Sequence, residues 1–368
     1  QPDCCFPNTL EAIQALQAVI DFAAETPKAL YYLGNLWYDK RQYPEAIACW
    51  EASKKQDETF PTVLRNLSLA YFNKLGKQEE AVVLLEKAFA LDTTDARILM
   101  ELDQLYKRLN RSHADRLAFL DKHKEVAFLR DDLYLEYITL LNQLGRYEEA
   151  IRMIDARQFH PWEGGEGKVP AQYQLARVEL VKRLLSEGKY PEALNLIEEC
   201  FTYPHNMGEG KLYGAQENDF NYYKACALQG LGKDQEAETL FLQASVGNSQ
   251  PAAAMYYNDQ KPDKIFYQGL ALRKLGREDE ARGRFNNLIS YGEKHVYDVF
   301  KMDYFAVSLP DLQIWEDDMN KKNRIHCNYL MALGHLGLGN NEKAMKYFDI
   351  AAEMDNNHQG VQIHREMI

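Results

Sequence analysis

Apolar and polar positions follow a repeated pattern along the chain. The pattern is clear in "LGNLWYDKRQYPEAIACWEAS" (33–53), "LLNQLGRYEEAIRMI" (140–154) and "LALRKLGREDEARGRFNNL" (270–288). Each block has an apolar stretch, a short turn, a charged triplet, an alanine and a bulky apolar residue four places later. Residues at this spacing lie on one face of a helix. Each block therefore predicts two antiparallel helices joined by a turn.

The alanine fixes the register of this repeat. Ala46 and Ala81 lie 35 residues apart, and the same position recurs along the chain. A small residue is needed where the two helices cross, because a larger side chain would push them apart. The register alanines are Ala46, Ala81, Ala150, Ala193, Ala237, Ala281 and Ala344. The bulky residues that follow them are Trp50, Leu85, Ile154, Ile197, Phe241, Phe285 and Phe348. The glycines expected to end the first helix in a left-handed conformation are Gly145, Gly188, Gly232, Gly276 and Gly339.

These features are typical of the tetratricopeptide repeat (TPR), in which stacked helix pairs bury a continuous core. We predict an all-α fold, namely an α-solenoid of about eight TPR-like helix-turn-helix repeats with loop inserts between the later repeats. A degenerate repeat is expected near 95–125, with Asp115 or Arg116 in place of the alanine. The predicted divisions are a capping segment or helix (1–26), repeats 1–4 (27–157), repeats 5–7 with glycine-rich inserts (158–288), an insert (289–324), and the last repeat with a C-terminal cap (325–368).

Composition and charge narrow the classes of partner. The chain has 368 residues and a net charge of −12. This charge argues against nucleic acid, because phosphate binding requires clustered lysine and arginine. No apolar run approaches the ~18–20 residues that a membrane span needs, so no membrane partner is expected. Six cysteines without zinc-site spacing favour free thiols and a cytoplasmic location. The opening residues "QPDCCFPN" lack a signal peptide and suggest a fragment of a longer protein.

Two glycine-rich segments share the sequence GEGK: "HPWEGGEGKV" (160–169) and "NMGEGKLYG" (206–214). In each, the first glycine of GEGK lies 15 residues after a register alanine, so we expect equivalent places in successive repeats. Pro161 and Pro204 are expected to end the preceding helices. Neither segment has the spacing or the Ser/Thr of a nucleotide-binding P-loop. Each is expected to lead into a helix whose free N–H groups can bind an anion or a sugar hydroxyl.

The candidate binding residues in these loops are His160, Trp162, Glu166, Lys168, Glu209, Lys211 and Tyr213. Trp162 is the most specific of them, because an exposed indole stacks on sugar rings or peptides. The alternative interpretation is structural. The loops would then be tight connections that need positive φ angles, and Trp162 would pack on its own repeat.

A second candidate site lies in the first repeats. Some TPR domains hold the C-terminal carboxylate of a peptide with lysine, asparagine and arginine residues on successive helices. Asn35 and Asn66 occupy the asparagine positions and Arg97 occupies one basic position. Tyr31 and Glu101 stand where two further basic residues belong, so the pattern is half complete. Asn35 and Asn66 remain candidate binding residues.

The insert before the last repeat has an apolar and a polar part. "DYFAVSLPDL" (303–312) is expected to pack on the repeats or to dock another domain, and packing is favoured. "WEDDMNKKN" (315–323) is expected to open the final helix pair. No catalytic motif occurs, and the sequence predicts no metal site, no cofactor and no enzyme activity for this segment alone.

Several segments together resemble one family. They are "PDCCFPNTLEAI" (2–13), "YYLGNLWYDK" (31–40), "FPTVLRNLSLAY" (60–71), "DARILMELDQLYKRL" (95–109), "FHPWEGGEGKV" (159–169), "GEGKLYGAQEND" (208–219) and "DYFAVSLPDL" (303–312). The chain resembles the C-terminal TPR region of large bacterial proteins that have an N-terminal domain of unknown function, related to galactose mutarotase-like β-sandwiches. The resemblance implies a missing carbohydrate-type domain and a link to saccharide metabolism. It supplies no catalytic residues.

Two hypotheses of function arise from these features. The first is an interaction module or scaffold that binds a protein or peptide partner, or its own covalently linked N-terminal domain. The second is the C-terminal half of a carbohydrate-active enzyme whose glycine-rich loops contribute to saccharide binding.

Overall fold

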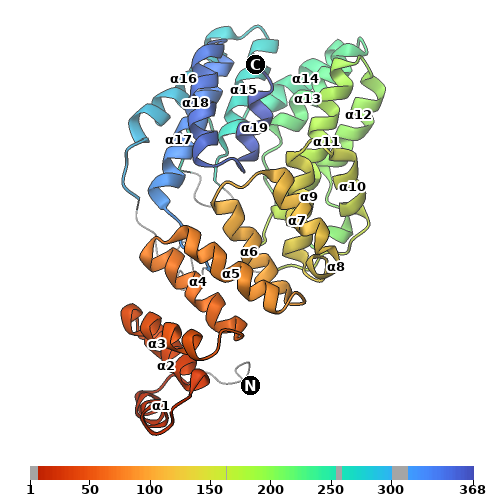
Figure 1. Cartoon of the computed structure of the whole chain (residues 1–368). Helices are drawn as coiled ribbons and strands as arrows, with labels where there is room; N and C mark the ends of the chain where they lie inside the picture. The colour runs from red at the N-terminus through yellow and green to blue at the C-terminus, as the bar shows by residue number, and fades with distance from the viewer. Residues whose placement is uncertain (1–6, 163, 254–258, 301–313) are drawn as a thin grey trace. The chain divides into compact units, whose positions relative to one another are not determined.

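The computed structural model describes residues 7–162, 164–253, 259–300 and 314–368. These residues form helices and connecting loops, and no strand occurs among them (Figure 1). They group into two compact units. Among the described residues, the first unit contains 7–109, 120–130 and 314–316, and the second contains 110–119, 131–162, 164–253, 259–300 and 317–368. The predicted apolar segment 303–312 lies outside the described residues.

The first unit begins with a single helix, α1 (Leu10–Phe22). Two helix pairs follow it, α2 (Pro27–Asp39) with α3 (Tyr43–Gln56) and α4 (Pro61–Leu75) with α5 (Gln78–Leu91). The unit is completed by α6 (Ala96–Arg108), the short α8 (Lys124–Ala127) and the segment Ile314–Glu316. α7 (His113–Lys122) follows α6 in the chain and begins in the second unit.

The second unit continues the helix pairs. These are α9 (Asp131–Gln143) with α10 (Tyr147–Asp155), α11 (Lys168–Ser186) with α12 (Tyr190–Glu198), α13 (Asn218–Gly230) with α14 (Asp234–Ser245), α15 (Pro262–Lys274) with α16 (Glu278–His295), and α17 (Met319–Gly337) with α18 (Asn341–Met354). Two 3₁₀ turns, η2 (Glu199–Phe201) and η3 (His205–Met207), and the final helix α19 (Gln359–Arg365) complete it. The described residues thus contain seven packed helix pairs, and this all-helical arrangement confirms the predicted α-solenoid of TPR-like repeats. The five divisions proposed above stay a prediction.

The register residues form the core as predicted. Each register alanine is at most 1% exposed, and each bulky residue four places later is at most 3% exposed. Small residues also stand on the facing helix. A Cβ atom added to Gly34 would lie 2.4 Å from the indole of Trp50, and one added to Gly269 would lie 2.4 Å from Phe285. The predicted turn glycines have positive φ angles of 71° to 76°. The two helices of a pair can thus approach closely because a glycine or alanine stands where they cross.

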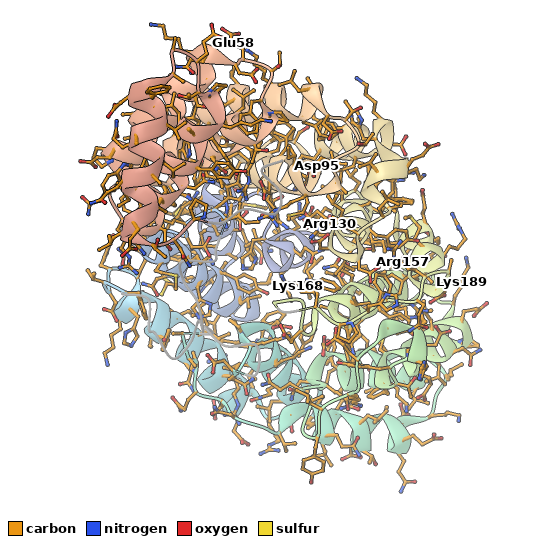
Figure 2. All side chains as sticks on the ribbon, turned by 90° about the horizontal axis from the view of Figure 1, so that it is seen from below. Glu58, Asp95, Arg130, Arg157, Lys168 and Lys189 are labelled. Carbon is orange, nitrogen blue, oxygen red and sulfur yellow. The ribbon has the colours of Figure 1, made fainter. Side chains whose placement is uncertain are left out.

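Charged side chains cover the outside of both units. The carboxylate side chain of Glu58 in the first unit is 72% exposed, and the side chain of Lys189 in the second is 54% exposed (Figure 2). Cys49, Cys200, Cys226 and Cys327 are free thiols, and burial raises the pKa of Cys200 to about 12. Among the described helices, none has both the length and the apolar character needed to cross a membrane.

Arg116 replaces the register alanine in the degenerate repeat. Its side chain is fully buried, and Leu120 follows it one turn later at 0% exposure. Its guanidinium donates to Glu136 Oε1 at 2.7 Å and to Asn357 Oδ1 at 2.8 Å. A buried charge needs such partners because desolvation is costly. The ion pair therefore allows a charged residue to occupy a buried position that is an alanine in the other repeats.

We predict that Arg116→Ala lowers the free energy of unfolding by roughly 3 kcal/mol, because it leaves Glu136 without its buried partner. Arg146→Ala is the control, since Arg146 pairs with Glu149 at 2.6 Å on an exposed surface. That change should cost less than about 1 kcal/mol. Urea denaturation followed by circular dichroism measures both. Equal costs would contradict the structural role assigned to Arg116.

Candidate functional site

The first helices of the pairs in unit 1 bring the two candidate asparagines together. The side-chain amide of Asn66 on α4 donates to Asn35 Oδ1 on α2 at 2.9 Å. Trp50 Nε1 donates to the same oxygen at 3.1 Å. Both asparagines are half-buried. They thus link successive repeats, and their role in binding a partner stays a prediction.

Glu101 on α6 organises the neighbouring charges. Its side chain is fully buried and accepts two hydrogen bonds from Arg65, each of 2.6 Å. Arg97 Nε adds a third at 3.0 Å, although the Arg97 side chain is 64% exposed. A two-pronged arginine–carboxylate pair is the strong form of this interaction. Glu101, which stands where the carboxylate-binding pattern needs a basic residue, is therefore the anchor for two arginines.

The same helices hold a short non-helical piece of the chain, Ile314–Glu316, which bends at Ile314 and Trp315. We call it the internal segment. Asn73 on α4 donates its amide to the carbonyl oxygen of Ile314 at 2.8 Å. The backbone N–H of Glu316 donates to Asn73 Oδ1 at 2.9 Å. A single side chain thus satisfies one acceptor and one donor of the segment's main chain, on either side of Trp315.

Trp315 provides the side-chain anchor of the internal segment. It is 1% exposed, and its Nε1 donates to the carbonyl oxygen of Glu101 at 3.1 Å. Its ring meets the edge of Phe72 with centroids 5.2 Å apart. Arg108 donates to the carbonyl oxygen of Trp315 at 3.2 Å. The apolar ring of the indole is packed against Phe72 and its polar N–H has a hydrogen-bond acceptor, as a buried tryptophan requires.

An ion pair completes the contact. Lys74 on α4 pairs with Glu316 and also lies 4.3 Å from the ring centre of Tyr43. Burial disfavours the charged ammonium, yet the hydrogen bond and the attraction of Glu316 raise the pKa of Lys74. We define the α4–α6 site as Phe72, Asn73, Lys74, Glu101 and Arg108. Sequence reasoning missed this site, and its only signal was one tryptophan in the otherwise polar stretch "WEDDMNKKN".

The two glycine-rich loops of unit 2 pack against each other. In the first loop, Gly167 has φ 72° and precedes α11, as expected. In the second loop, Gly208 has φ 72°, but α13 begins only at Asn218. Glu209 of the second loop accepts a hydrogen bond of 2.7 Å from the N–H of Gly167. The predicted anion position at the start of α11 is therefore taken by a carboxylate of the chain itself.

The second loop also contacts the end of α10, the helix that precedes the first loop. The Asn206 amide donates to the carbonyl oxygens of Ile154 and Arg157 at 2.8 and 3.0 Å. A Cβ atom at Gly208 would lie 2.6 Å from the carbonyl oxygen of Phe159. The prediction that prolines end the second helices is wrong. α10 ends at Asp155 and α12 at Glu198, before Pro161 and Pro204, and carbonyl groups at the end of α10 are capped by Asn206.

The remaining candidate residues of the two loops make contacts of their own within unit 2. The indole of Trp162 lies over the backbone of Gly165, where a Cβ atom would come within 2.2 Å of the ring. The His160 side chain is 80% exposed and its Nδ1 lies 3.1 Å from Asp131 Oδ2. Lys211 donates to the carbonyl oxygen of Phe201 at 2.9 Å and pairs with Glu217. Lys168 is the first residue of α11.

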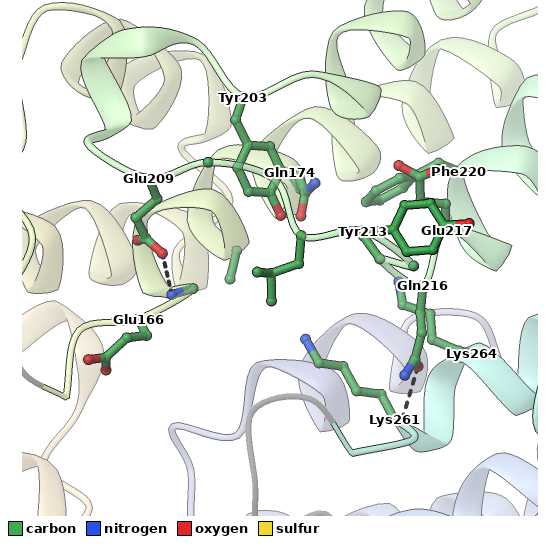
Figure 3. Close-up of a pocket in the computed structure, with 16 residues that line it drawn as sticks. Glu166, Gln174, Tyr203, Glu209, Tyr213, Gln216, Glu217, Phe220, Lys261 and Lys264 are labelled. Carbon is green, nitrogen blue, oxygen red and sulfur yellow. Dashed lines mark hydrogen bonds between the residues drawn. The ribbon is translucent and has the colours of Figure 1, made fainter.

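A cavity of about 520 Å³ lies beside the loops in unit 2. Glu166 and Glu209 line one side, and Tyr213, Gln216 and Glu217 line the other (Figure 3). Gln174 and Tyr203 also line it, and burial raises the pKa of Tyr203. Three of the predicted residues, Glu166, Glu209 and Tyr213, are thus brought to one cavity. Trp162 and His160 line a neighbouring cavity of about 240 Å³, which shares Glu166 and Glu209 with the larger one.

One charge of the larger cavity, Lys264, is neutralised by carboxylates of the chain. Lys264 is 7% exposed and pairs with Asp219 at 2.5 Å. Burial opposes its charge, but the carboxylates of Asp219 and Asp263 raise the pKa of Lys264. Within the described residues, no group of three or more His, Cys, Asp or Glu side chains is placed to hold a metal ion.

We predict that Gly208→Ala destabilises the protein by roughly 1–3 kcal/mol, because it forces a side chain into a left-handed conformation and against Phe159. Gly210→Ala is the matched control. Gly210 has no positive φ angle and no atom within 4 Å of an added Cβ, so this change should be neutral or stabilising by up to about 1 kcal/mol. Thermal unfolding measures both variants, and equal effects would contradict the close packing of the loops.

Comparison with known proteins finds the same kind of repeat that the sequence pattern predicts. The sequence model of the tetratricopeptide repeat family matches residues 265–291. Among solved structures, a Naa15/Naa10 complex bound to HypK-THB contains a similar chain, with 11% identity, a TM-score of 0.44, and coverage of 95% of this chain and 61% of that one. A tetratricopeptide repeat protein from Parabacteroides merdae is 17% identical with a TM-score of 0.36, over 71% of this chain and 90% of that one. YrrB, described as a TPR protein with an unusual peptide-binding site, is 13% identical with a TM-score of 0.35, over 63% and 91%. The chain thus carries a tetratricopeptide repeat, and the N-terminal domain implied by the resemblance stays a prediction.

Proposed function

We propose that the chain is an interaction scaffold that binds a protein partner along α2, α4 and α6 of unit 1. Stacked helix pairs of this repeat class present an extended surface, and such surfaces are used for binding. The partner is a separate protein, or the N-terminal domain that the resemblance implies. The observation that carries the proposal is the internal segment, because the α4–α6 site already holds a non-helical stretch of chain by its main chain and its side chains.

The contacts with the internal segment have the form of peptide recognition. Asn73 forms hydrogen bonds with main-chain groups on both sides of Trp315, and such groups are present in every peptide. Hydrogen bonds to the main chain provide affinity, and pockets for individual side chains provide specificity. The buried indole of Trp315 supplies such a side-chain contact. A surface with both features is suited to a partner that presents a non-helical segment.

Site-specific photo-crosslinking tests this function. A photoreactive phenylalanine at Arg97, which is exposed beside Glu101, should crosslink one partner protein in the cells that make the chain. The control is the same group at Val83 on α5, a second helix of a pair, where the native side chain is 63% exposed. Crosslinks from position 97 and none from position 83 are expected. The same products from both positions, or none from either, would contradict the scaffold function.

A second candidate function is saccharide binding at the cavity beside the glycine-rich loops. The observation in its favour is that Glu166, Glu209 and Tyr213 line one cavity although they come from two separate loops. Carboxylates and amides such as Gln174 and Gln216 bind hydroxyl groups, and aromatic rings stack on sugar faces. The residues of the cavity thus match the chemistry of a saccharide.

Thermal unfolding in the presence of a panel of mono- and oligosaccharides tests this candidate. A sugar at a hundredfold excess over its Kd should stabilise the chain by about 2.7 kcal/mol. Tyr213→Ala should reduce this effect. Tyr297→Ala, which changes another highly exposed tyrosine outside the residues lining the cavity, should leave it unchanged. Saccharide binding is ruled out at this cavity if no sugar acts, or if both variants respond like the wild type.

A further inference from the structure

The internal segment occupies the α4–α6 site from a distant part of the sequence. Asn73 and Ile314 are separated by 241 positions in the chain. The segment lies between α16, which ends at His295, and α17, which begins at Met319. It therefore belongs to no helix pair. Its described contacts within unit 1 come from side chains and a carbonyl oxygen of the first helices, where a separate peptide would also bind.

The main-chain contacts do not depend on the sequence of the segment. Both functional atoms of the Asn73 amide are used on the segment's backbone, at 2.8 and 2.9 Å. Arg108 adds a third main-chain contact, to the carbonyl oxygen of Trp315. A free peptide in the same conformation offers the same three groups.

Two side chains of the segment give the site its selectivity. The indole of Trp315 fits between Phe72 and the carbonyl oxygen of Glu101, which accepts its N–H. Phenylalanine would leave that hydrogen bond unmade. The next residue, Glu316, meets the ammonium group of Lys74, whose position is also set by the ring of Tyr43. A peptide that matches the site needs an indole followed by a carboxylate.

We propose that the α4–α6 site recognises a partner peptide with a tryptophan followed by an acidic residue, and that the internal segment competes with this peptide. The inference rests on the scaffold function proposed above and specifies the chemistry of the partner. A segment of the same chain acts at an effective concentration on the order of millimolar. The competing peptide therefore binds more weakly to the intact chain than to a chain whose segment is impaired.

A fluorescent peptide with the chain's own sequence "DLQIWEDD" (311–318) is the probe, and fluorescence anisotropy with the full chain is the measurement. Trp315→Ala should bind this peptide at least about tenfold more tightly than the wild type, because the internal competitor has lost its anchor. The control peptide "DLQIAEDD" should bind neither chain. Adding Asn73→Ala to Trp315→Ala should weaken binding of the probe about tenfold, because two hydrogen bonds are lost.

A second variant keeps the test valid if Trp315→Ala does not fold. Glu316→Lys keeps the buried indole of Trp315 and places a second positive charge next to Lys74. The internal segment is then held less tightly, while the residues of the α4–α6 site are unchanged. It should also bind the probe more tightly than the wild type does. Circular dichroism establishes that each variant is folded. The inference is overturned if wild type and folded variants bind the probe equally, or if none binds it.

The outcomes separate this inference from the scaffold function. Crosslinking from position 97 without any binding of the probe would leave the scaffold in place and make the internal segment a fixed part of unit 1. Tight binding of the probe to the variants without crosslinking would support the peptide site and remove the evidence for a cellular partner. Failure of both measurements would remove both proposals.

Discussion

The close crossing of two helices at a small residue is the constraint on which the rest of the structure depends. Ala46, Ala81 and their equivalents are almost completely buried, and the bulky residue one turn later fills the space that the alanine leaves. Because this spacing repeats, the first helices of successive pairs line up. That alignment brings Asn35 to Asn66 and Arg65 to Glu101, and it sets α4 beside the residues of α6 that hold Trp315.

Departures from the repeat are compensated by polar contacts between distant residues. Arg116 stands at the alanine position and is neutralised by Glu136. The glycine-rich loops interrupt the second unit, and Asn206 and Glu209 of one loop cap helix ends beside the other. The insert before α17 contributes Trp315 to the first unit. In each case a buried or terminal polar group finds a partner inside the chain, as the cost of leaving it unpaired requires.

The sequence was sufficient for the local structure and insufficient for the long-range contacts. Helical periodicity, the register alanines and the turn glycines predicted the pairs, because each depends on residues within one repeat. The repeated GEGK suggested two equivalent loops, yet a helix begins directly after Gly167 and none begins directly after Gly208. Glu209 also fills the anion position of the other loop. The contact between Asn73 and Ile314 joins residues 241 positions apart, and no periodic pattern encodes it.

The central claim is that the internal segment is an exchangeable ligand of the α4–α6 site. The most direct test is the solvent exchange of the Trp315 indole N–H, followed by nuclear magnetic resonance on the ¹⁵N-labelled full chain and assigned with Trp315→Phe. The account predicts a protected N–H in the free chain, because it is bonded to Glu101, and loss of protection when saturating "DLQIWEDD" peptide displaces the segment. Protection that the peptide leaves unchanged would contradict the claim and make Trp315 a permanent part of the core.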